Sequence, residues 1–395
     1  MKTKSFSNNF YLLLISLVSA MGGLLFGYDW VVIGGAKPFY EIFFAIENSP
    51  GMQGWVMGSA ILGCLIGVTI AGSLSDKYGR KPLMIIAAIT FTVSAIGTGA
   101  VNDLNWFIFY RIFGGIGIGI ASNLSPMYIA EVSPSHVRGK FVSINQLTIV
   151  LGILAAQFVN WLIAEPVVPG ENILETWNGQ MGWRWMFWAE VVPSALFFIL
   201  IFFIPESPRW LATKLQYGKA ENILSHIGGK EYAKKEIESI KTVISATKEK
   251  LNIRMLFQGK IPGILLIGIV IAAFQQWCGL NVVFNYAQEI FAAAGYGVSD
   301  ILFNIVVTGV TNVIFTFVGM YTVDKLGRRS LMLFGASGLA IIYIIMGICY
   351  YLNITGMAVL IMVVLAIACY AMTLAPVTWV VLSEIFPNRI RGMAM

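Results

Sequence analysis

The stretch Asp76-Lys-Tyr-Gly-Arg-Lys-Pro-Leu-Met84 has a second copy in this chain, Asp324-Lys-Leu-Gly-Arg-Arg-Ser-Leu-Met332, with six of nine residues identical. A second pattern follows each copy: Glu131-x-x-Pro134-x-x-x-Arg138-Gly139 and then Glu384-x-x-Pro387-x-x-x-Arg391-Gly392. Two motifs that recur in the same order indicate an internal duplication. The sequence therefore predicts two similar halves.

The segments around these motifs are far more apolar than those of a soluble protein. Of the 395 residues, 57% are hydrophobic and only 12% are charged, about half the charged share of an ordinary globular chain. The mean hydropathy is +0.77. These values exclude a disordered chain and a collagen-like chain, and they predict an all-α polytopic membrane protein.

Ten segments are long enough to cross a membrane, because a bilayer core about 30 Å thick needs about 20 apolar residues per helix. The first follows Lys2 and Lys4 and has a weak cleavage pattern at Val18-Ser19-Ala20, as a signal peptide would. Because the apolar run continues past Ala20, we favour a membrane span. The ten expected spans are about 10–35, 52–74, 82–101, 104–130, 141–164, 183–204, 261–293, 299–322, 330–352 and 356–386.

The basic residues predict one orientation. When the spans alternate in direction, most of the 26 Lys and Arg residues fall on the side of the N-terminus, and only Lys37 and Arg184 fall in segments on the other side. The positive-inside rule then predicts a multi-pass protein of the cell membrane with a cytoplasmic N-terminus. It also explains the net charge of +6 without a nucleic-acid partner.

Only one loop is long. It covers residues 205–260 and carries Lys/Glu-rich helical patches, in which Ile237, Ile240 and Ile244 follow a helical period. We favour a solvated amphipathic linker over a ligand-binding domain. The predicted division is an N-terminal six-helix bundle at 1–204, a cytoplasmic helical linker at 205–260, and the first four helices of a C-terminal bundle at 261–395.

The repeat also predicts a truncated sequence. In the first half, two spans follow the motif that ends at Gly139, whereas in the second half the sequence stops at Met395. We therefore expect ten of twelve spans.

Three charged side chains are expected inside the apolar spans. Asp29 lies about 19 residues into the first span, Arg111 lies about 10 Å from the outer end of the fourth, and Glu190 lies at a similar depth in the sixth. Because unpaired charges in a bilayer are costly, these three residues are expected to meet. A carboxylate beside an arginine can exchange a proton as its surroundings change, as a proton-coupled carrier requires. A static ion pair between helices is the alternative.

A second set of charges lies where the spans are expected to meet the cytoplasm, at equivalent places in both halves. Ion pairs that break when this side of a carrier opens would explain the set. The alternative is ordinary positive-inside topology, although that does not require the carboxylates. The expected gating residues are Asp76, Arg80, Glu131, Arg138, Glu206, Arg209, Asp324, Arg328, Glu384 and Arg391.

Polar amides mark a candidate substrate pathway. Gln146 and Gln157 are about 20° apart on a helical wheel and share one stripe of the fifth span. Gln276 and Asn281 would be about 140° apart on an ideal helix, so their convergence on one ligand needs a break, which Gly279 permits. Amides both donate and accept, as a neutral polyhydroxyl ligand requires. They can instead form hydrogen bonds between helices.

Two further polar or aromatic residues fall near this pathway. Asn312 lies near mid-depth of the eighth span, and in the tenth span Pro376 precedes Trp379. The proline places the aromatic ring beside a helix irregularity.

No pattern typical of an enzyme is present. The only histidines, His136 and His226, lie in loops, and no spacing suits a metal site or a nucleophile with its base. The stretch Gly114-Gly-Ile-Gly-Ile-Gly119 is similar to a nucleotide-binding loop, but inside a span it serves close helix packing. We expect no cofactor and no metal.

In combination the motifs resemble those of a sugar porter of the major facilitator superfamily, which includes bacterial xylose/proton symporters and glucose transporters. The resemblance covers essentially the whole chain and implies two pseudo-symmetric helical bundles that rock around a central site. It rests on Gly72-Ser-Leu-Ser-Asp-Lys-Tyr-Gly-Arg-Lys81, Ser125-Pro-Met-Tyr-Ile-Ala-Glu131, Pro205-Glu-Ser-Pro-Arg-Trp-Leu211, Gln275-Gln276 with Asn281, and Asp324-x-x-Gly327-Arg328.

The resemblance also implies roles for individual residues. It assigns proton coupling to Asp29, with Arg111 as its partner. The sugar-site positions that it implies are Gln146, Gln275, Gln276, Asn281, Asn312 and Trp379.

Three departures from the family pattern leave the sugar open: Ile153 in place of a glutamine, Asn285 in place of a tyrosine, and Leu374-Ala375 before Pro376. We expect a proton-coupled symporter of a hexose or a xylose-like pentose, monomeric in the lipid bilayer. A facilitative sugar uniporter and a non-transporting sugar sensor are the alternatives.

Overall fold

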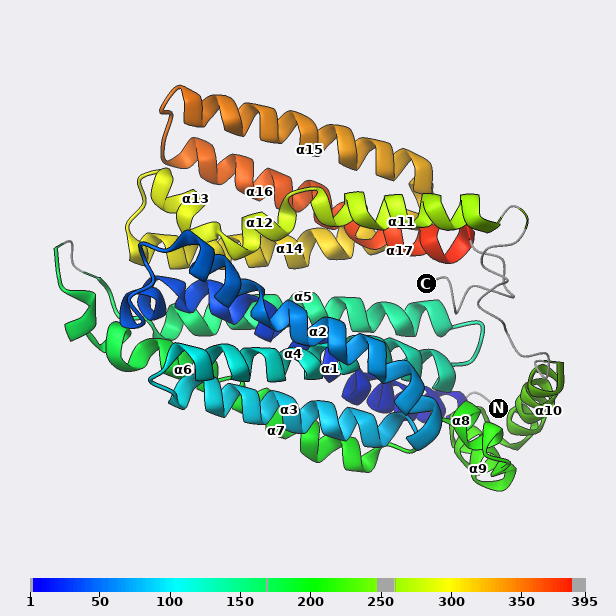
Figure 1. The fold of residues 1–395 in the computed structure, drawn as a ribbon. Helices are drawn as coiled ribbons and strands as arrows, with labels where there is room; N and C mark the ends of the chain where they lie inside the picture. The colour runs from blue at the N-terminus through cyan, green and yellow to red at the C-terminus, as the bar shows by residue number, and fades with distance from the viewer. Residues whose placement is uncertain (1–2, 168–169, 247–258, 260, 386–395) are drawn as a thin grey trace. The chain divides into compact units, whose positions relative to one another are not determined.

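The computed structural model describes residues 3–167, 170–246, 259 and 261–385, and every regular element within them is helical (Figure 1). The chain divides into two compact units, unit 1 (Met1–Ala246) and unit 2 (Thr247–Met395). The long helices of unit 1 are α1 (Thr3–Phe43), α2 (Pro50–Tyr78), α3 (Arg80–Ala100), α4 (Leu104–Val132) and α5 (Arg138–Ile163). Shorter elements follow: η1 (Ile173–Glu175), η2 (Asn178–Gly182), α6 (Trp183–Trp188), α7 (Val191–Leu200), η3 (Ile201–Phe203), α8 (Pro208–Thr213), α9 (Tyr217–Gly228) and α10 (Lys230–Ala246). Unit 2 contains α11 (Ile261–Trp277), α12 (Leu280–Asn285), α13 (Ala287–Ala293), α14 (Val298–Leu326), α15 (Arg328–Tyr351), α16 (Met357–Met372) and α17 (Leu374–Ile385).

The predicted ten spans are confirmed among the described residues. Ten helical segments there are long and apolar enough to cross a membrane. The first differs at its end, because α1 continues to Phe43 rather than stopping near residue 35. Lys37 therefore lies inside this helix and is fully buried, where the sequence placed it in a loop.

Small residues set the distances between the helices of unit 1. Helix α2 packs along α4, and α1 packs along α5. A Cβ atom added to Gly115 on α4 would overlap the carbonyl oxygen of Ala60 on α2, and one on Gly63 would overlap that of Ile112. Backbones that approach this closely allow dense packing where water supplies no hydrophobic driving force between spans. The expected packing role of the 114–119 glycines is confirmed.

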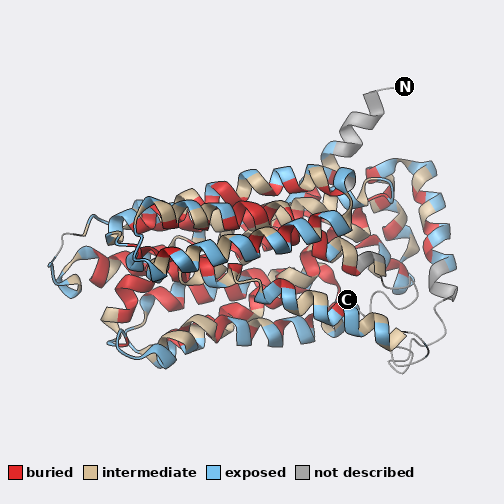
Figure 2. Cartoon of the chain, turned by 90° about the horizontal axis from the view of Figure 1, so that it is seen from above, coloured by how far each residue is buried: buried red, intermediate tan, exposed pale blue. Residues whose placement is uncertain are grey.

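Large apolar side chains cover the outside of the helices. Leu65, Phe203, Trp277 and Tyr351 each expose more than half of their surface. Figure 2 shows the buried residues on the helix sides that face neighbouring helices and the exposed ones on the outer sides. An apolar exterior of this extent suits hydrocarbon rather than water.

Two spans of unit 2 are broken. The seventh is interrupted between α11 and α12 at Gly279, whose φ of +89° is left-handed, so the break that the sequence predicted there is confirmed. The tenth is interrupted between α16 and α17 at Thr373, three residues before Pro376. Helix α17 contacts both α11 and α14, and α14 packs along α16.

The duplication is visible in the backbone. Gly79 joins α2 to α3 with a φ of +105°, and Gly327 joins α14 to α15 with a φ of +80°. The arginine after each glycine donates to a carbonyl five residues earlier, Arg80 to Ser75 at 3.1 Å and Arg328 to Val323 at 3.4 Å. The repeated sequence motif therefore encodes a repeated turn.

The loop predicted as a solvated linker is docked in its described part. Helices α8, α9 and α10 bury a small apolar core of their own, and Ile237 and Ile240 belong to it. These helices group with unit 1, because α9 contacts α1 and the Trp210 indole nitrogen donates to the carbonyl of Asp76. The three-part division of the chain remains a prediction.

Candidate functional site

Three charged residues meet inside unit 1. The Arg111 guanidinium donates to Asp29 through Nη1–Oδ1 at 2.5 Å, and its Nη2 approaches the Asp29 carbonyl at 3.4 Å. Glu190 lies between α6 and α7 and interacts electrostatically with both Asp29 and Arg111. Each of the three is only 2% exposed, so the cluster is closed to solvent.

This cluster is only partly satisfied. Asp29 Oδ2, Arg111 Nε and Glu190 Oε1 are buried without a hydrogen-bond partner among the described residues, and so is the nearby Tyr28 hydroxyl. Buried polar atoms without partners cost free energy unless a water molecule or a ligand satisfies them. One guanidinium and two carboxylates also leave unequal charge in a place buried from bulk solvent.

Four polar side chains of unit 2 form a continuous chain of hydrogen bonds. Asn281 Nδ2 donates to Gln276 Oε1 at 2.7 Å, and Gln276 Nε2 donates to Gln275 Oε1 at 2.8 Å. Gln275 Nε2 then donates to the Tyr370 hydroxyl at 2.6 Å. The break at Gly279 places Asn281 back beside Gln276, which an ideal helix would not do.

The other predicted sugar-site residues are spread over both units. Gln146 is half-buried on α5 of unit 1, where Gln157 is fully buried. Asn312 is buried on α14, and Trp379 on α17 is 50% exposed. Within unit 2, the contacts of α17 with α11 and α14 bring the helices of Trp379, Gln275 and Asn312 together.

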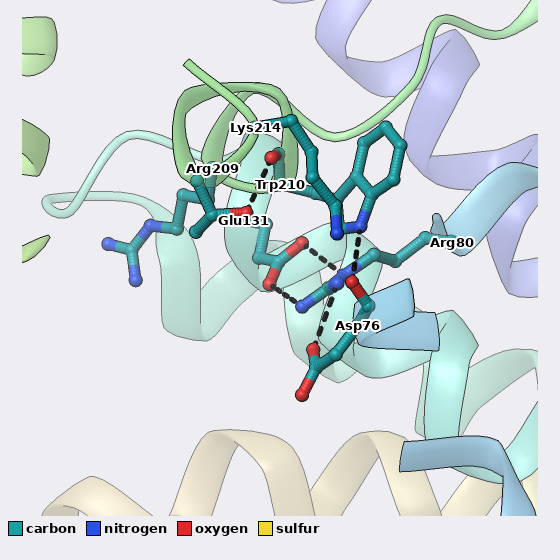
Figure 3. Close-up of a pocket in the computed structure, with 7 residues that line it drawn as sticks. Asp76, Arg80, Glu131, Arg209, Trp210 and Lys214 are labelled. Carbon is teal, nitrogen blue, oxygen red and sulfur yellow. Dashed lines mark hydrogen bonds and ion pairs between the residues drawn. The ribbon is translucent and has the colours of Figure 1, made fainter. Parts of the chain in front are cut away.

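A third cluster lies where the loop between α2 and α3 meets α8, which we call the α2–α3 end. Arg80 forms a two-pronged ion pair with Glu131 on α4, at 3.0 Å from Nε and 2.9 Å from Nη2, and it also bonds Asp76 at 3.2 Å. Figure 3 shows Arg80 held between the two carboxylates, whereas Arg209 extends away from Glu131. Together with Trp210 and nearby residues of α8 they line a cavity of about 380 Å³.

Glu206 caps a helix instead of forming the expected ion pair. Its carboxylate accepts the backbone N–H groups of Arg80 and Lys81 at 3.1 and 3.2 Å, so it caps the first turn of α3. Neither Arg138 nor Arg209 lies within ion-pair distance of a carboxylate in the described part of the chain. Arg138 instead donates to the Ser133 carbonyl at 3.4 Å. Glu206 forms the cap rather than an ion pair because the first N–H groups of α3, which have no partner within the helix, are fixed beside its carboxylate.

The structure does not describe the side chains of three predicted gating residues. Arg391 is outside the described residues, and only the backbone is described for Asp324 and Glu384. Their pairing remains a prediction.

Glu206→Gln should remove a pH-dependent component of stability. Burial raises the pKa of the Glu206 carboxyl, and the backbone hydrogen bonds oppose that rise. This pKa is higher in the folded protein than in the unfolded chain. The Glu206 carboxyl therefore contributes fully to the free energy of unfolding below its unfolded-state pKa, and it loses that contribution as the pH rises through its folded-state pKa. The melting temperature of the parent should therefore fall relative to that of Glu206→Gln as the pH rises above the ordinary glutamate pKa of about 4.3.

The matched control is Glu238→Gln, which changes an exposed carboxylate on α10. Thermal unfolding in detergent at several pH values gives both comparisons. Parallel curves for the parent and Glu206→Gln would contradict the prediction.

Three contributors escaped the sequence analysis. Tyr370 ends the amide chain, and Lys81 Nζ donates to the carbonyls of Phe202 and Ile204 at 2.8 Å, where the sixth span ends. Arg184 donates to the Gly99 and Val101 carbonyls at 2.8 Å, at the end of α3. No sequence signal marks these roles, since each depends on a neighbour far away in the chain.

Ten apolar helical segments, a buried cluster of charged residues in unit 1 and a chain of amides in unit 2 indicate a polytopic membrane transporter. Comparison with known sequences identifies the transporter family. The profile of the sugar (and other) transporter family matches residues 15–395, and this chain belongs to that family.

The matches to curated relatives cover nearly all of this chain and more than four fifths of each relative. The D-xylose-proton symporter of Escherichia coli strain K12 is 39% identical over 412 residues, which cover 98% of this chain and 82% of the relative. The arabinose-proton symporter of Bacillus subtilis strain 168 is 37% identical over 393 residues, covering 99% and 82%. The glucose transport protein of Synechocystis sp. is 38% identical over 406 residues, covering 100% and 86%.

Solved structures agree with this assignment. The partially occluded, inward-open xylose transporter XylE from E. coli superposes with a TM-score of 0.83 at 35% identity, over 97% of this chain and 89% of that one. The same major facilitator superfamily symporter bound to 6-bromo-6-deoxy-D-glucose also gives 0.83, at 37% identity over 98% and 85%. The fold is thus the major facilitator fold, as the motifs implied.

Proposed function

We propose that this protein is a proton-coupled monosaccharide symporter that works by alternating access, with Asp29, Arg111 and Glu190 as its proton-coupling residues. The observation that carries the proposal is the closed cluster of two carboxylates and one guanidinium. The xylose-proton and arabinose-proton symporters among its relatives support the same assignment.

The charge balance of the cluster explains why a proton matters. With both carboxylates ionised, the cluster carries one uncompensated negative charge in a site without solvent, which is costly. One bound proton removes that charge. Proton binding therefore changes the cost of keeping Asp29 and Arg111 paired and buried, and it biases the two conformations of the carrier.

The amides supply the substrate site of this proposal. Gln275, Gln276 and Asn281 present several donors and acceptors in a small region, and Trp379 offers a partly exposed ring on a helix that contacts theirs. A neutral sugar needs such groups, because each hydroxyl both donates and accepts. Asn312 completes the proposed set within unit 2, and Gln146 on α5 of unit 1 stays a predicted sugar-site residue.

Gln275→Ala should weaken sugar binding by about 1–3 kcal/mol, because its neighbours would lose hydrogen bonds in a buried place. Isothermal titration of the purified protein with D-xylose and with D-glucose measures the effect. Gln216→Ala is the control, since Gln216 is an exposed linker residue. Equal affinities for Gln275→Ala and the parent would remove Gln275 from the site.

Uptake into proteoliposomes tests the symport itself. A symporter accumulates sugar above the outside concentration when a pH gradient is imposed, whereas a uniporter only equilibrates it. The stretch 152–157, which is similar to that of glucose facilitators, keeps the uniporter as the second candidate. Sugar binding without any uptake would instead indicate a sensor.

Several further properties belong to the same proposal. The N-terminus would be cytoplasmic in the cell membrane, since the basic residues gather at the α2–α3 end and in the linker. The Arg80–Glu131 pair and its counterparts in the second half would break and re-form as this end opens and closes. Each monomer would transport independently.

A further inference from the structure

We propose that Tyr370 is a positioning residue for sugar recognition, which its hydroxyl achieves by anchoring the chain of amides through Gln275. The proposal rests on the proposed role of those amides in binding sugar. It assigns a function to a residue that sequence reasoning did not single out.

The hydrogen bonds run in one direction toward Tyr370. Asn281 donates to Gln276, Gln276 donates to Gln275, and Gln275 donates to the phenolic oxygen. Gln275 is only 8% exposed, whereas Gln276 is exposed. Tyr370 therefore holds the buried end of the chain, whereas the exposed Gln276 and the half-buried Asn281 are accessible to a ligand.

Both ends of the Gln275 amide are occupied, its oxygen by Gln276 and its nitrogen by Tyr370. An amide can exchange its oxygen and nitrogen by rotating through 180°, and its hydrogen-bond partners select one orientation. Without the Tyr370 hydroxyl, the amide nitrogen loses this partner in a buried place. The Gln275 amide is then no longer held in one orientation. If it rotates, it presents its nitrogen rather than its oxygen to Gln276, and the hydrogen bonds that orient Gln276 and Asn281 are lost.

Tyr370 also ties together two helix interruptions. The amide chain crosses the break at Gly279, and the backbone carbonyl of Tyr370 accepts the N–H of Thr373 at 3.1 Å, at the break between α16 and α17. The ring packs in an apolar cluster with Cys278, Tyr343 and Leu374. Packing fixes the ring, so the hydroxyl is a rigid anchor.

Tyr370→Phe keeps the ring and removes only the anchor. Using D-xylose and D-glucose as the probe sugars, we expect the dissociation constant to rise about five- to twentyfold, as for loss of one hydrogen bond. The melting temperature should change little. Tyr343→Phe is the matched control, because it removes a hydroxyl from the same cluster that has no hydrogen-bond partner among the described residues. Its affinity should stay within about twofold of the parent.

A double-mutant cycle separates positioning from a general structural role. If Tyr370 acts through Gln275, adding Tyr370→Phe to Gln275→Ala should not weaken binding further. Additive losses would overturn the proposal, as would parent affinity in Tyr370→Phe when Gln275→Ala binds weakly. Parent affinity in Gln275→Ala itself would overturn both the substrate site and this role of Tyr370.

Discussion

Asp29→Asn should abolish the accumulation of sugar driven by a pH gradient and should leave sugar binding and exchange in place. The asparagine keeps the shape of the aspartate but carries no charge, so it resembles the protonated form permanently. The amide chain that is proposed to bind sugar lies in unit 2 and is not altered. The carrier could therefore still alternate with sugar bound, but it could not release the coupled proton.

The size of the effect follows from the driving force. One pH unit corresponds to about 1.4 kcal/mol, which supports up to about tenfold accumulation when one proton accompanies each sugar. We expect that ratio to fall to about one in Asp29→Asn, measured in proteoliposomes with the membrane potential clamped. Asp103→Asn is the control, since Asp103 caps α4 through an oxygen that the amide retains. Accumulation that survives in Asp29→Asn would exclude the coupling role of Asp29.

Gly115→Ala should prevent α2 and α4 from packing. The added Cβ would overlap the carbonyl oxygen of Ala60, a backbone atom that no side-chain rotation can move away. Overpacking of this kind costs at least about 2 kcal/mol, and the displaced helix also carries Gly63 away from its own close contact. We expect little folded protein after detergent extraction, by size-exclusion chromatography and thermal unfolding.

For Gly72→Ala, which is the same chemical change as Gly115→Ala, we expect no loss of folded protein. Gly72 lies on α2 with open space around its Cα. Alanine there should leave stability unchanged or raise it by up to about 1 kcal/mol, because alanine is the better helix former. Equal behaviour of the two variants would show that the close contact at Gly115 does not control packing.

The depth of the buried charges was predictable from the sequence. Each span starts at a recognisable boundary and rises about 1.5 Å per residue, so position along the chain converts into depth. That arithmetic placed Asp29, Arg111 and Glu190 at similar levels. It did not predict which oxygen Arg111 holds, nor that Glu190 has an unpaired oxygen, because those facts depend on the rotation of each helix about its axis.

The α2–α3 end shows where charge patterns mislead. Opposite charges that recur at equivalent places in both halves predicted that Glu206 would join an ion pair. In the structure the carboxylate caps α3 instead, because fixed backbone N–H groups lie closer to it than any flexible arginine. A charge pattern does not reveal a competing backbone donor from a helix more than a hundred residues away.

The sequence alone determined the ten spans, the repeated turns at Gly79 and Gly327, and the interruption at Gly279. These features are local: a bilayer requires each span to satisfy its own backbone, and glycine adopts a positive φ wherever it stands. Only the tertiary structure decided which side chains became partners. Tyr370 and Gln275 are 95 residues apart, and Asp29 and Arg111 are 82 apart. Such contacts depend on the rotation and spacing of the helices. Both arise from packing between helices, so the sequence of any one segment does not determine them.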